Sequence, residues 1–454
     1  MKKNFFRYYY WLFLEFIKKY SRLILMSFFI GFISLIGFLS VSPYLKLIFN
    51  KQEIIGLVGN YDFTNLPDKI MKKVSNGLVT INEKGEIVPV LANSWEVKDQ
   101  GKQYRFYLKN NLLWNDDKKF NASDIDYQFD DVQVKVVDKN VIDFYLSKPL
   151  AIFPTYLNKP LIRPPLIGIA GFYKLGRFKI INGSLKELTL VPNTKDLLTI
   201  KYKFYNNESD LVTAYKRGEI NEMTLIKKTV ADTFANWKNS QIVKSVDYTR
   251  LLTLFFNNQD KAFTNKDIKN AFSMMIDYQK LSEFGELARG PIPPLSWAYN
   301  PLLKTDVYDI ETATKIVKKE IVATESAQLN LLTSYDYYDV ADSIAGEIKK
   351  TGLKVDINMI SYDRPDNFDL LLVFWNLPNN PDQYYFWHST QTGLKKSNIS
   401  NYKNIKVDLL LEQGRNTIDL REREKIYQEF QKIIQDDPPA LFLYYPYVYT
   451  IKRK

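Results

Sequence analysis

Residues 74–131 read VSNGLVTINEKGEIVPVLANSWEVKDQGKQYRFYLKNNLLWNDDKKFNASDIDYQFDD. Apolar and polar residues alternate in 78–81 and again in 103–108, and clusters of Gly, Asn, Asp or Lys bound each run. This alternation is typical of half-buried β-strands that turns connect. The stretch therefore predicts strands that bury one face in a common core.

The spacing of apolar residues changes after residue 120. Asn121 or Ser123 can cap a short helix whose apolar positions are Ile125 and Phe129. Asp124 would lie in the first turn, where the helix dipole favours negative charge. We therefore expect a helix to follow the strands.

The order of these parts resembles the N-terminal signature of the extracytoplasmic solute-binding proteins of ABC importers, in the oligopeptide- and dipeptide-binding family, family 5. An unrelated sheet with turns is the alternative, but many positions match in register. The matching residues are Gly77-Leu78, Pro89, Leu91-Ala92, Ser94-Trp95, Gly101, Tyr104, Phe106, Leu108, Trp114-Asn115, Ala122, Asp124 and Tyr127. The resemblance implies an α/β, periplasmic-binding-protein-like fold of two lobes, of the class II type with mixed sheets and flanking helices.

Further matches extend the resemblance over roughly residues 52–454. The proline-rich stretch 290–301, GPIPPLSWAYNP, resembles a distinctive loop of the family, and its prolines restrict the backbone. A helix opened by Asp419 and Glu422 and a last strand from 440 resemble the family's C-terminus. In contrast, a longer insertion that the family usually carries before the hairpin at 132–148 is almost missing here, so we expect a reduced subdomain.

These features predict how the chain is divided. We expect a basic cytoplasmic tail at 1–22, a transmembrane signal anchor at 23–45, and lobe I at 52–248 with the reduced subdomain at about 76–165. Lobe II would occupy 249–420, and a C-terminal helix and strand at 421–454 would return to lobe I.

The N-terminal region predicts a membrane anchor. Residues 23–45 carry no charge and as a helix would cross a hydrocarbon core of about 30 Å. Six Lys and Arg precede this run against one Glu, so the N-terminus is expected in the cytoplasm and the rest of the chain outside. A cleavable signal peptide ending at Ser42 is the alternative, which Pro43 and the length of the run disfavour. The aromatic segment 5–17 would either lie among lipid headgroups or continue the same helix.

Composition and charge exclude several classes of protein. With 454 residues and 46% hydrophobic content the chain can form two or three domains with large cores. It has no cysteine, which excludes disulfides and Cys-ligated metal sites. Residues 1–50 account for +6 of the net charge of +11, so membrane topology explains the charge better than a nucleic-acid partner does.

The resemblance places ligand recognition around a buried strand and aromatic cluster at 368–387. In peptide binders of the family an Asp shortly after the strand's Trp pairs with the α-amine of the ligand. Pro378 or Leu377 stands at that place here, and Asp382 is the nearest substitute, although a turn or helix cap would also explain it. By residue-wise resemblance the candidates for lining the cleft are Asp382 and the following six residues, about half of which we expect to reach the ligand: Trp375, Asn376, Trp297, Tyr299, Asn257 and Tyr173. Burial in a core is the alternative for each aromatic residue.

The sequence offers few residues that could form a catalytic site, so we expect that the protein is not an enzyme and binds no cofactor. His388 is the single histidine, so neither a Ser-His triad nor a His-based metal site can be assembled with confidence from the sequence. The pairs Asp116-Asp117 and Asp436-Asp437 lie beside turn and stop signals, and no glycine-rich phosphate loop occurs.

The sequence therefore favours a monomeric receptor in the cell membrane, with one span and its large domain outside the cytoplasm. It would bind an oligopeptide or similar small solute between two lobes and deliver it to ABC permease subunits. The alternatives are a sensor or peptide chaperone that serves no importer, and a receptor for a non-peptide ligand such as a sugar.

Overall fold

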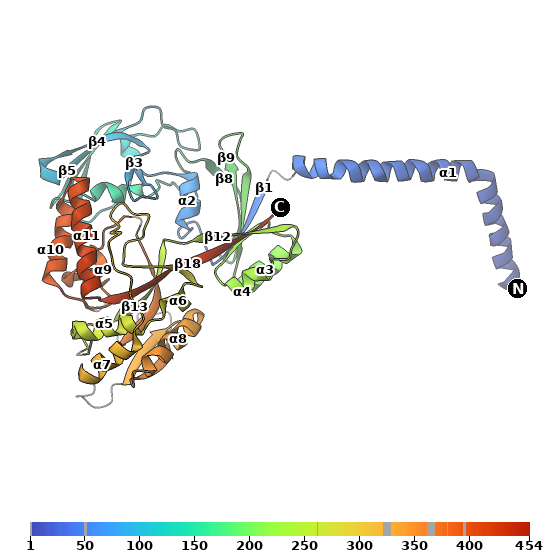
Figure 1. Ribbon diagram of the computed structural model, residues 1–454. Coiled ribbons are helices and arrows are strands. Elements are labelled where there is room, and N and C mark those ends of the chain that lie inside the picture. The colour runs from blue at the N-terminus through green and yellow to red at the C-terminus, as the bar shows by residue number, and fades with distance from the viewer. Residues whose placement is uncertain are drawn as a thin grey trace.

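The computed structural model describes residues 2–49, 52–260, 262–320, 328–360, 368–378, 380–393 and 396–454. Two sheets and a hairpin organise the folded part, and a long N-terminal helix extends away from it (Figure 1). The architecture is a mixed α/β fold of two lobes, as the resemblance implied.

The larger sheet runs through both lobes and contains twelve strands in the described part of the chain. Along its path the order is β16-β15-β17-β13-β18-β11-β1-β10-β9-β8, and β12 and β14 each pair with β18. The strands are β1 Gln52–Val58, β8 Tyr173–Ile181, β9 Ser184–Pro192, β10 Thr199–Tyr205, β11 Glu222–Leu225, β12 Ser240–Val246, β13 Arg250–Phe256, β14 Gly285–Leu287, β15 Gln328–Thr333, β16 Lys354–Met359, β17 Leu370–Asn376 and β18 Ala440–Arg453.

Strand β18 joins the two lobes. Its first half pairs antiparallel with β13 in lobe II, and its second half pairs with β11 and β12 in lobe I. Figure 1 shows it as one long arrow that crosses the centre of the molecule. The division at residue 420 and the return of 421–454 to lobe I stay predictions.

The smaller sheet belongs to the reduced subdomain of lobe I. Its order is β4-β5-β7-β6, with β4 Ala92–Lys98, β5 Gln103–Leu108, β6 Val132–Asp138 and β7 Val141–Leu146, and a hairpin of β2 Val79–Ile81 and β3 Ile87–Pro89 accompanies it. The alternation in 103–108 buries Tyr104, Phe106 and Leu108 on one face. The predicted strand at 103–108 and the predicted hairpin after residue 131 are confirmed.

The predicted helix after residue 120 is wrong beyond its first turn. Asn121 and Asp124 form a capping box, but the helical part is the single 3₁₀ turn η2, Ala122–Asp124. The ring of Phe129 instead packs 5.7 Å from that of Phe153 and 6.2 Å from that of Tyr127. Burial of aromatic rings in the subdomain core therefore decides the path of 125–129 against the helical pattern.

Helices pack their apolar faces on the sheets. Residues 52–248 form α2 Asp68–Val74, α3 Glu208–Arg217 and α4 Lys228–Asp232, and residues 249–454 form α5 Lys266–Met275, α6 Tyr278–Leu281, α7 Ile310–Glu320, α8 Tyr338–Lys349, α9 Tyr384–Trp387, α10 Ile405–Asn416 and α11 Leu420–Asp436. Strand β15, helix α8 and strand β16 form a parallel strand-helix-strand unit. The Asp419 side chain accepts a hydrogen bond from the backbone N–H of Glu422 at 2.9 Å, so the predicted cap of α11 is also confirmed.

Helix α1 is Lys2–Phe49, and Figure 1 shows that it bends sharply in its N-terminal part. Within it, Arg7–Gly37 is long and apolar enough to cross a membrane, and none of that window is buried against the rest of the chain. The aromatic segment 5–17 belongs to α1, and its placement among lipid headgroups stays a prediction. The side chains of 38–45, the end of the predicted span, lie outside the described residues.

Candidate functional site

A cavity of about 800 Å³ lies between the two lobes, and we call it the interlobe cavity. Lobe I contributes Lys69 of α2 and the tip of the β2–β3 hairpin, and lobe II contributes Pro291–Ser296 and the segment that follows β17. The connection between β12 and β13, residues 247–249, closes the cavity where the two lobes join, and we call this connection the hinge. A volume of this size is within the range of ligand pockets, roughly 300–1,000 Å³.

The wall at the hinge is held in place by hydrogen bonds. Asp247 accepts hydrogen bonds from the backbone N–H and the hydroxyl of Thr249 at 3.0 and 2.6 Å. The backbone N–H of Asp247 donates to Pro446 at 2.9 Å, and that of Leu377 donates to Thr249 at 2.8 Å. The hinge turn, β18 and the segment after β17 therefore meet at one edge of the cavity.

Trp297 connects the lobes at the rim of the cavity. Its backbone N–H donates to the carbonyl of Lys84 at 2.8 Å, and its indole Nε1 donates to the carbonyl of Gly85 at 3.1 Å. The Arg423 guanidinium lies 5.1 Å from the centroid of the Trp297 ring, and the Tyr427 ring packs at 5.8 Å. A side chain of lobe II thus holds the hairpin tip of lobe I.

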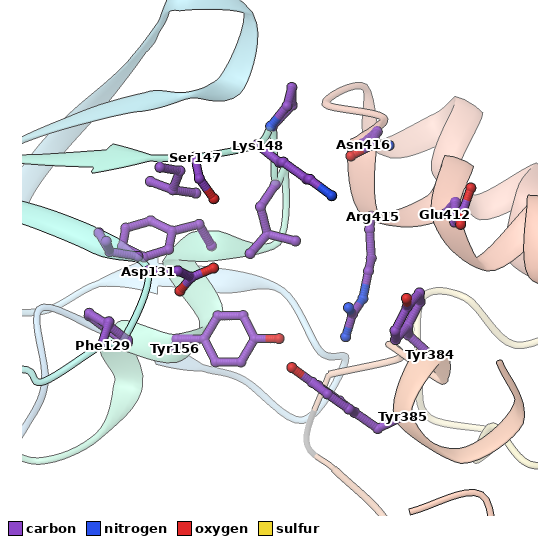
Figure 2. Close-up of a pocket in the computed structure, with 15 residues that line it drawn as sticks. Phe129, Asp131, Ser147, Lys148, Tyr156, Tyr384, Tyr385, Glu412, Arg415 and Asn416 are labelled. Atoms are coloured by element: carbon purple, nitrogen blue, oxygen red, sulfur yellow. The ribbon is translucent and has the colours of Figure 1, made fainter. Parts of the chain in front are cut away.

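A second cavity, of about 540 Å³, lies between the reduced subdomain and α10. Figure 2 shows Tyr156 of the subdomain facing Tyr385 and Arg415 of lobe II, with Lys148 reaching in from the loop after β7. Burial, and secondarily the charge of Asp382, raise the pKa of the Tyr156 hydroxyl, so that hydroxyl stays protonated at neutral pH. The segment that follows β17 separates this cavity from the interlobe cavity, because its residues line both.

Asp382 forms a buried ion pair with Arg415 between the two cavities. Arg415 Nε lies 3.1 Å from both carboxylate oxygens and its Nη2 lies 2.6 Å from one of them. The guanidinium also lies 3.8 Å from the ring centroid of Tyr384. Asp382 accepts a hydrogen bond from the backbone N–H of Tyr384 at 3.1 Å as well. A ligand amine would therefore have to compete with Arg415 for this carboxylate.

The other predicted residues do not gather at one place. Trp375 is buried among Phe255, Phe386 and Trp387. Its indole Nε1 is buried and has no hydrogen-bond partner within the described part of the chain. Asn376 follows it and is exposed. As ligand contacts, all seven predicted residues stay a prediction.

Three more predicted residues lie away from the interlobe cavity. Tyr299 lines a separate cavity of about 390 Å³ beside β14. Asn257 donates from its amide to the carbonyl of Phe368 at 3.0 Å, at the end of β13. Tyr173 is buried in the core of lobe I, with Lys73 Nζ at 5.5 Å from its ring. Of the predicted aromatic residues, Trp297 is the one with hydrogen bonds at the cavity rim.

Sequence reasoning missed the hairpin tip at 82–85, residues 245–249 at the hinge and Lys69 as parts of the cavity wall. The turn signal Asn82-Glu83-Lys84-Gly85 was readable, but its proximity to residue 297 was not. Arg415 was also missed, since its partner stands 33 positions earlier and no local pattern links them.

No cluster of three or more His, Asp or Glu side chains that could hold a metal ion occurs in the described ranges. The His388 side chain is buried. Its Nδ1 accepts a hydrogen bond from the Thr390 backbone N–H at 3.1 Å, and its Nε2 lies 3.2 Å from the Glu412 carboxylate. Its ring stacks on Tyr384 at 4.2 Å. These contacts hold α9 against α10.

Comparison with known proteins yields a consistent set of matches. The family model described as bacterial extracellular solute-binding proteins, family 5 Middle, matches residues 86–133 and 126–397. The probable D,D-dipeptide-binding periplasmic protein DdpA of Escherichia coli (strain K12) is 25% identical over 78% of this chain and 78% of its own. The oligopeptide-binding protein AppA of Bacillus subtilis (strain 168) is 26% identical over 55% of this chain and 50% of its own.

Solved structures share the fold. The substrate-binding protein CtaP from Listeria monocytogenes superposes with a TM-score of 0.75 at 22% identity, covering 88% of this chain and 94% of its own. NikZ from Campylobacter jejuni, in complex with Ni(L-His), gives a TM-score of 0.72 at 21% identity, covering 89% of this chain and 94% of its own.

Proposed function

The chain belongs to the bacterial extracellular solute-binding proteins of family 5, and from this we propose that it is a membrane-anchored receptor for an oligopeptide or a similar small solute. It binds the solute between its lobes outside the cytoplasm and delivers it to an ABC transporter. Relatives named for dipeptide and oligopeptide binding support the peptide class. Helix α1, with a candidate span at Arg7–Gly37, supports the anchor.

The observation that carries this proposal is the interlobe cavity, whose wall comes from both lobes and from the hinge. A ligand that contacts both lobes binds the closed arrangement better than the open one, so it shifts the population toward closure. Hinge bending about the 247–249 connection is the motion this wall allows. Binding and release need no covalent chemistry.

The composition of the cavity wall supports a ligand that is recognised through neutral polar groups. Leu377 and Pro378 line the cavity where peptide binders of the family carry a carboxylate, and Asp382 is paired with Arg415. The charged groups of the wall are Lys69, Glu83 and Asp247, and Asp247 already accepts hydrogen bonds from Thr249. The other polar groups are amides and hydroxyls such as those of Asn82 and Gln383. We infer that a free peptide amino terminus contributes little to affinity, and that backbone amides contribute most of it.

The test uses the full chain, purified in detergent, with native mass spectrometry of whatever co-purifies. Thermal shifts are then measured against matched libraries of free and N-acetylated peptides and of sugars. Binding of both peptide forms with similar affinity supports the proposal. A chain that neither retains nor binds any member of the peptide libraries contradicts it.

A matched pair of substitutions links binding to the cavity. Leu295→Trp fills the interlobe cavity at a half-exposed position, and it is expected to abolish the thermal shift. Leu302→Trp adds the same ring at a highly exposed position that does not line this cavity, and is expected to leave binding unchanged. Equal loss in both variants would argue against this location.

Delivery to an importer is tested separately, since a sensor or chaperone would bind ligand equally well. Stimulation of a co-reconstituted permease and ATPase, dependent on this chain and on ligand, supports transport. Binding without any partner permease would favour the sensor or chaperone.

A further inference from the structure

One edge of lobe I lies next to the end of the membrane helix. Helix α1 ends at Phe49 and β1 begins at Gln52, so three peptide units connect them. Three units span at most about 11 Å, even when fully extended. The uncharged run 23–45 ends four residues before Phe49, which adds about 6 Å of helix. If this run crosses the bilayer, the first residue of β1 lies within about 17 Å of its outer end.

Several strand ends share this edge with Gln52. Thr199, the first residue of β10, pairs with Gln52 in the parallel register, and Leu197 and Leu198 precede it. Phe172 stands before Tyr173, the first residue of β8, which pairs with Pro192 at the end of β9. The same end of the sheet therefore gathers segments that are far apart in the sequence.

The end of β18 lies at this edge too. The Asn221 amide donates to the carbonyl of Gln52 at 3.4 Å, and the Arg453 backbone N–H donates to the carbonyl of Asn221 at 2.8 Å. The Lys454 backbone N–H then donates to the carbonyl of Asn239 at 3.0 Å. Figure 1 shows the C-terminus beside β1, on the side from which α1 departs.

We call this surface the anchor-proximal edge and define it by Phe172, Lys195, Leu197, Leu198, Lys238 and Lys454. Phe172 is 66% exposed, and Leu198 is 51% exposed. The three lysines are exposed, and none has an ion-pair partner within the described residues. Of the acidic neighbours, Glu53 and Glu222 share the single charge of Lys452, so the charge of one of these two carboxylates and that of Asp196 remain against the three lysines. Large apolar side chains next to unpaired lysines are typical of surfaces that contact anionic lipid headgroups.

We propose that the anchor-proximal edge docks on the membrane that α1 crosses, with Phe172, Leu197 and Leu198 at the headgroup level and the lysines on anionic phospholipid. This inference rests on the membrane anchor of the proposed function and adds an orientation to it. Docking holds lobe I against the bilayer. Closure of the cleft then moves lobe II, whose helices α5, α7 and α8 lie at the opposite end of the molecule (Figure 1).

The test uses spin labels, which the absence of native cysteine makes simple. Single variants Leu198→Cys and Phe172→Cys of the full chain are labelled and reconstituted into phosphatidylglycerol–phosphatidylcholine vesicles. The control is Val136→Cys on β6, which is 47% exposed and lies in the reduced subdomain. Unchanged thermal unfolding and flotation with the vesicles establish that each variant is folded and anchored.

The measurement is the accessibility of each spin label to oxygen and to a water-soluble nickel chelate. Docking predicts that the labels at 172 and 198 are more accessible to oxygen than to the chelate, and that the label at 136 shows the reverse. In pure phosphatidylcholine vesicles the difference at 172 and 198 is expected to shrink at least twofold. A floating chain whose three labels are equally accessible to the chelate overturns docking but leaves the anchor and ligand binding intact. Contact that does not depend on lipid charge overturns the assignment to anionic lipid. A chain that fails to float overturns the anchor and docking together.

Discussion

The indole Nε1 of Trp297 donates a hydrogen bond of 3.1 Å to the backbone carbonyl of Gly85, although 212 positions separate the two residues. The bond joins the proline-rich loop of lobe II to the hairpin tip of lobe I. Both segments line the interlobe cavity. The contact therefore has to break whenever the lobes separate fully.

Trp297→Phe removes this bond but keeps the backbone bond to Lys84. Because one hydrogen bond contributes about 0.5–1.5 kcal/mol net, we expect ligand dissociation to become about 2- to 12-fold faster. Stopped-flow release measures this rate. Trp237→Phe, in the core beside α3 and α4, is the control and should leave the rate unchanged. An unchanged rate in Trp297→Phe would show that the bond does not limit opening.

Asp382→Asn leaves the buried Arg415 guanidinium without its counter-charge. Removing one partner of a buried pair costs about 3–5 kcal/mol of the free energy of unfolding, and urea denaturation measures this loss. The double variant Asp382→Asn/Arg415→Gln is expected to lose less than the sum of the single variants. Glu96→Gln, which breaks an exposed pair with Lys98, should leave the free energy of unfolding nearly unchanged. Additive losses at 382 and 415 would contradict the coupling.

Pro378→Asp places a carboxylate in the cavity wall, at one of the two positions where the family resemblance implies one. A hydrogen bond to a charged group contributes about 1.5–3 kcal/mol, so affinity for peptides with a free α-amine should rise by about tenfold or more over their N-acetylated forms. Calorimetric titration of both forms gives the ratio. Leu302→Asp adds the same charge at a residue that does not line the cavity and should leave the ratio unchanged.

The lowered pKa of Glu347 predicts that the free energy of unfolding falls in acid. Burial disfavours its charged form, but hydrogen bonds from Lys350, Tyr308 and Lys280 outweigh burial and lower the pKa of Glu347 to about 2 from 4.5. Because the unfolded chain binds a proton at higher pH than the folded chain does, Glu347 stabilises the fold above about pH 4.5. This contribution is lost as the pH falls toward 2.

Denaturant unfolding at a series of pH values between 2 and 6 measures this contribution. Wild type should lose more stability than Glu347→Gln does over that interval, because the variant has lost the titrating carboxyl group. Glu83→Gln, at the exposed hairpin tip, should follow the wild-type curve. Parallel curves for wild type and Glu347→Gln would contradict the assignment.

The sequence by itself determined the local elements of this protein. The strand at 103–108, the hairpin after residue 131 and the Asp419 cap of α11 all follow from patterns a few residues long. Turn chemistry, side-chain alternation and capping act between near neighbours, so a short stretch of sequence specifies them. Matched in order, they also identified the family.

Only the tertiary structure decided the candidate site. The Trp297–Gly85 bond, the Asp382–Arg415 pair and the passage of β18 through both lobes join residues far apart in the chain, and no local pattern encodes which partners meet. Tertiary burial also overrode the helical pattern at 125–129, because Phe129 gains more from packing on Phe153 than one further turn of helix provides. Trp375 lies in the core behind the cavity, whereas the cavity wall comes from turns and the hinge, which only the packing of two lobes brings together.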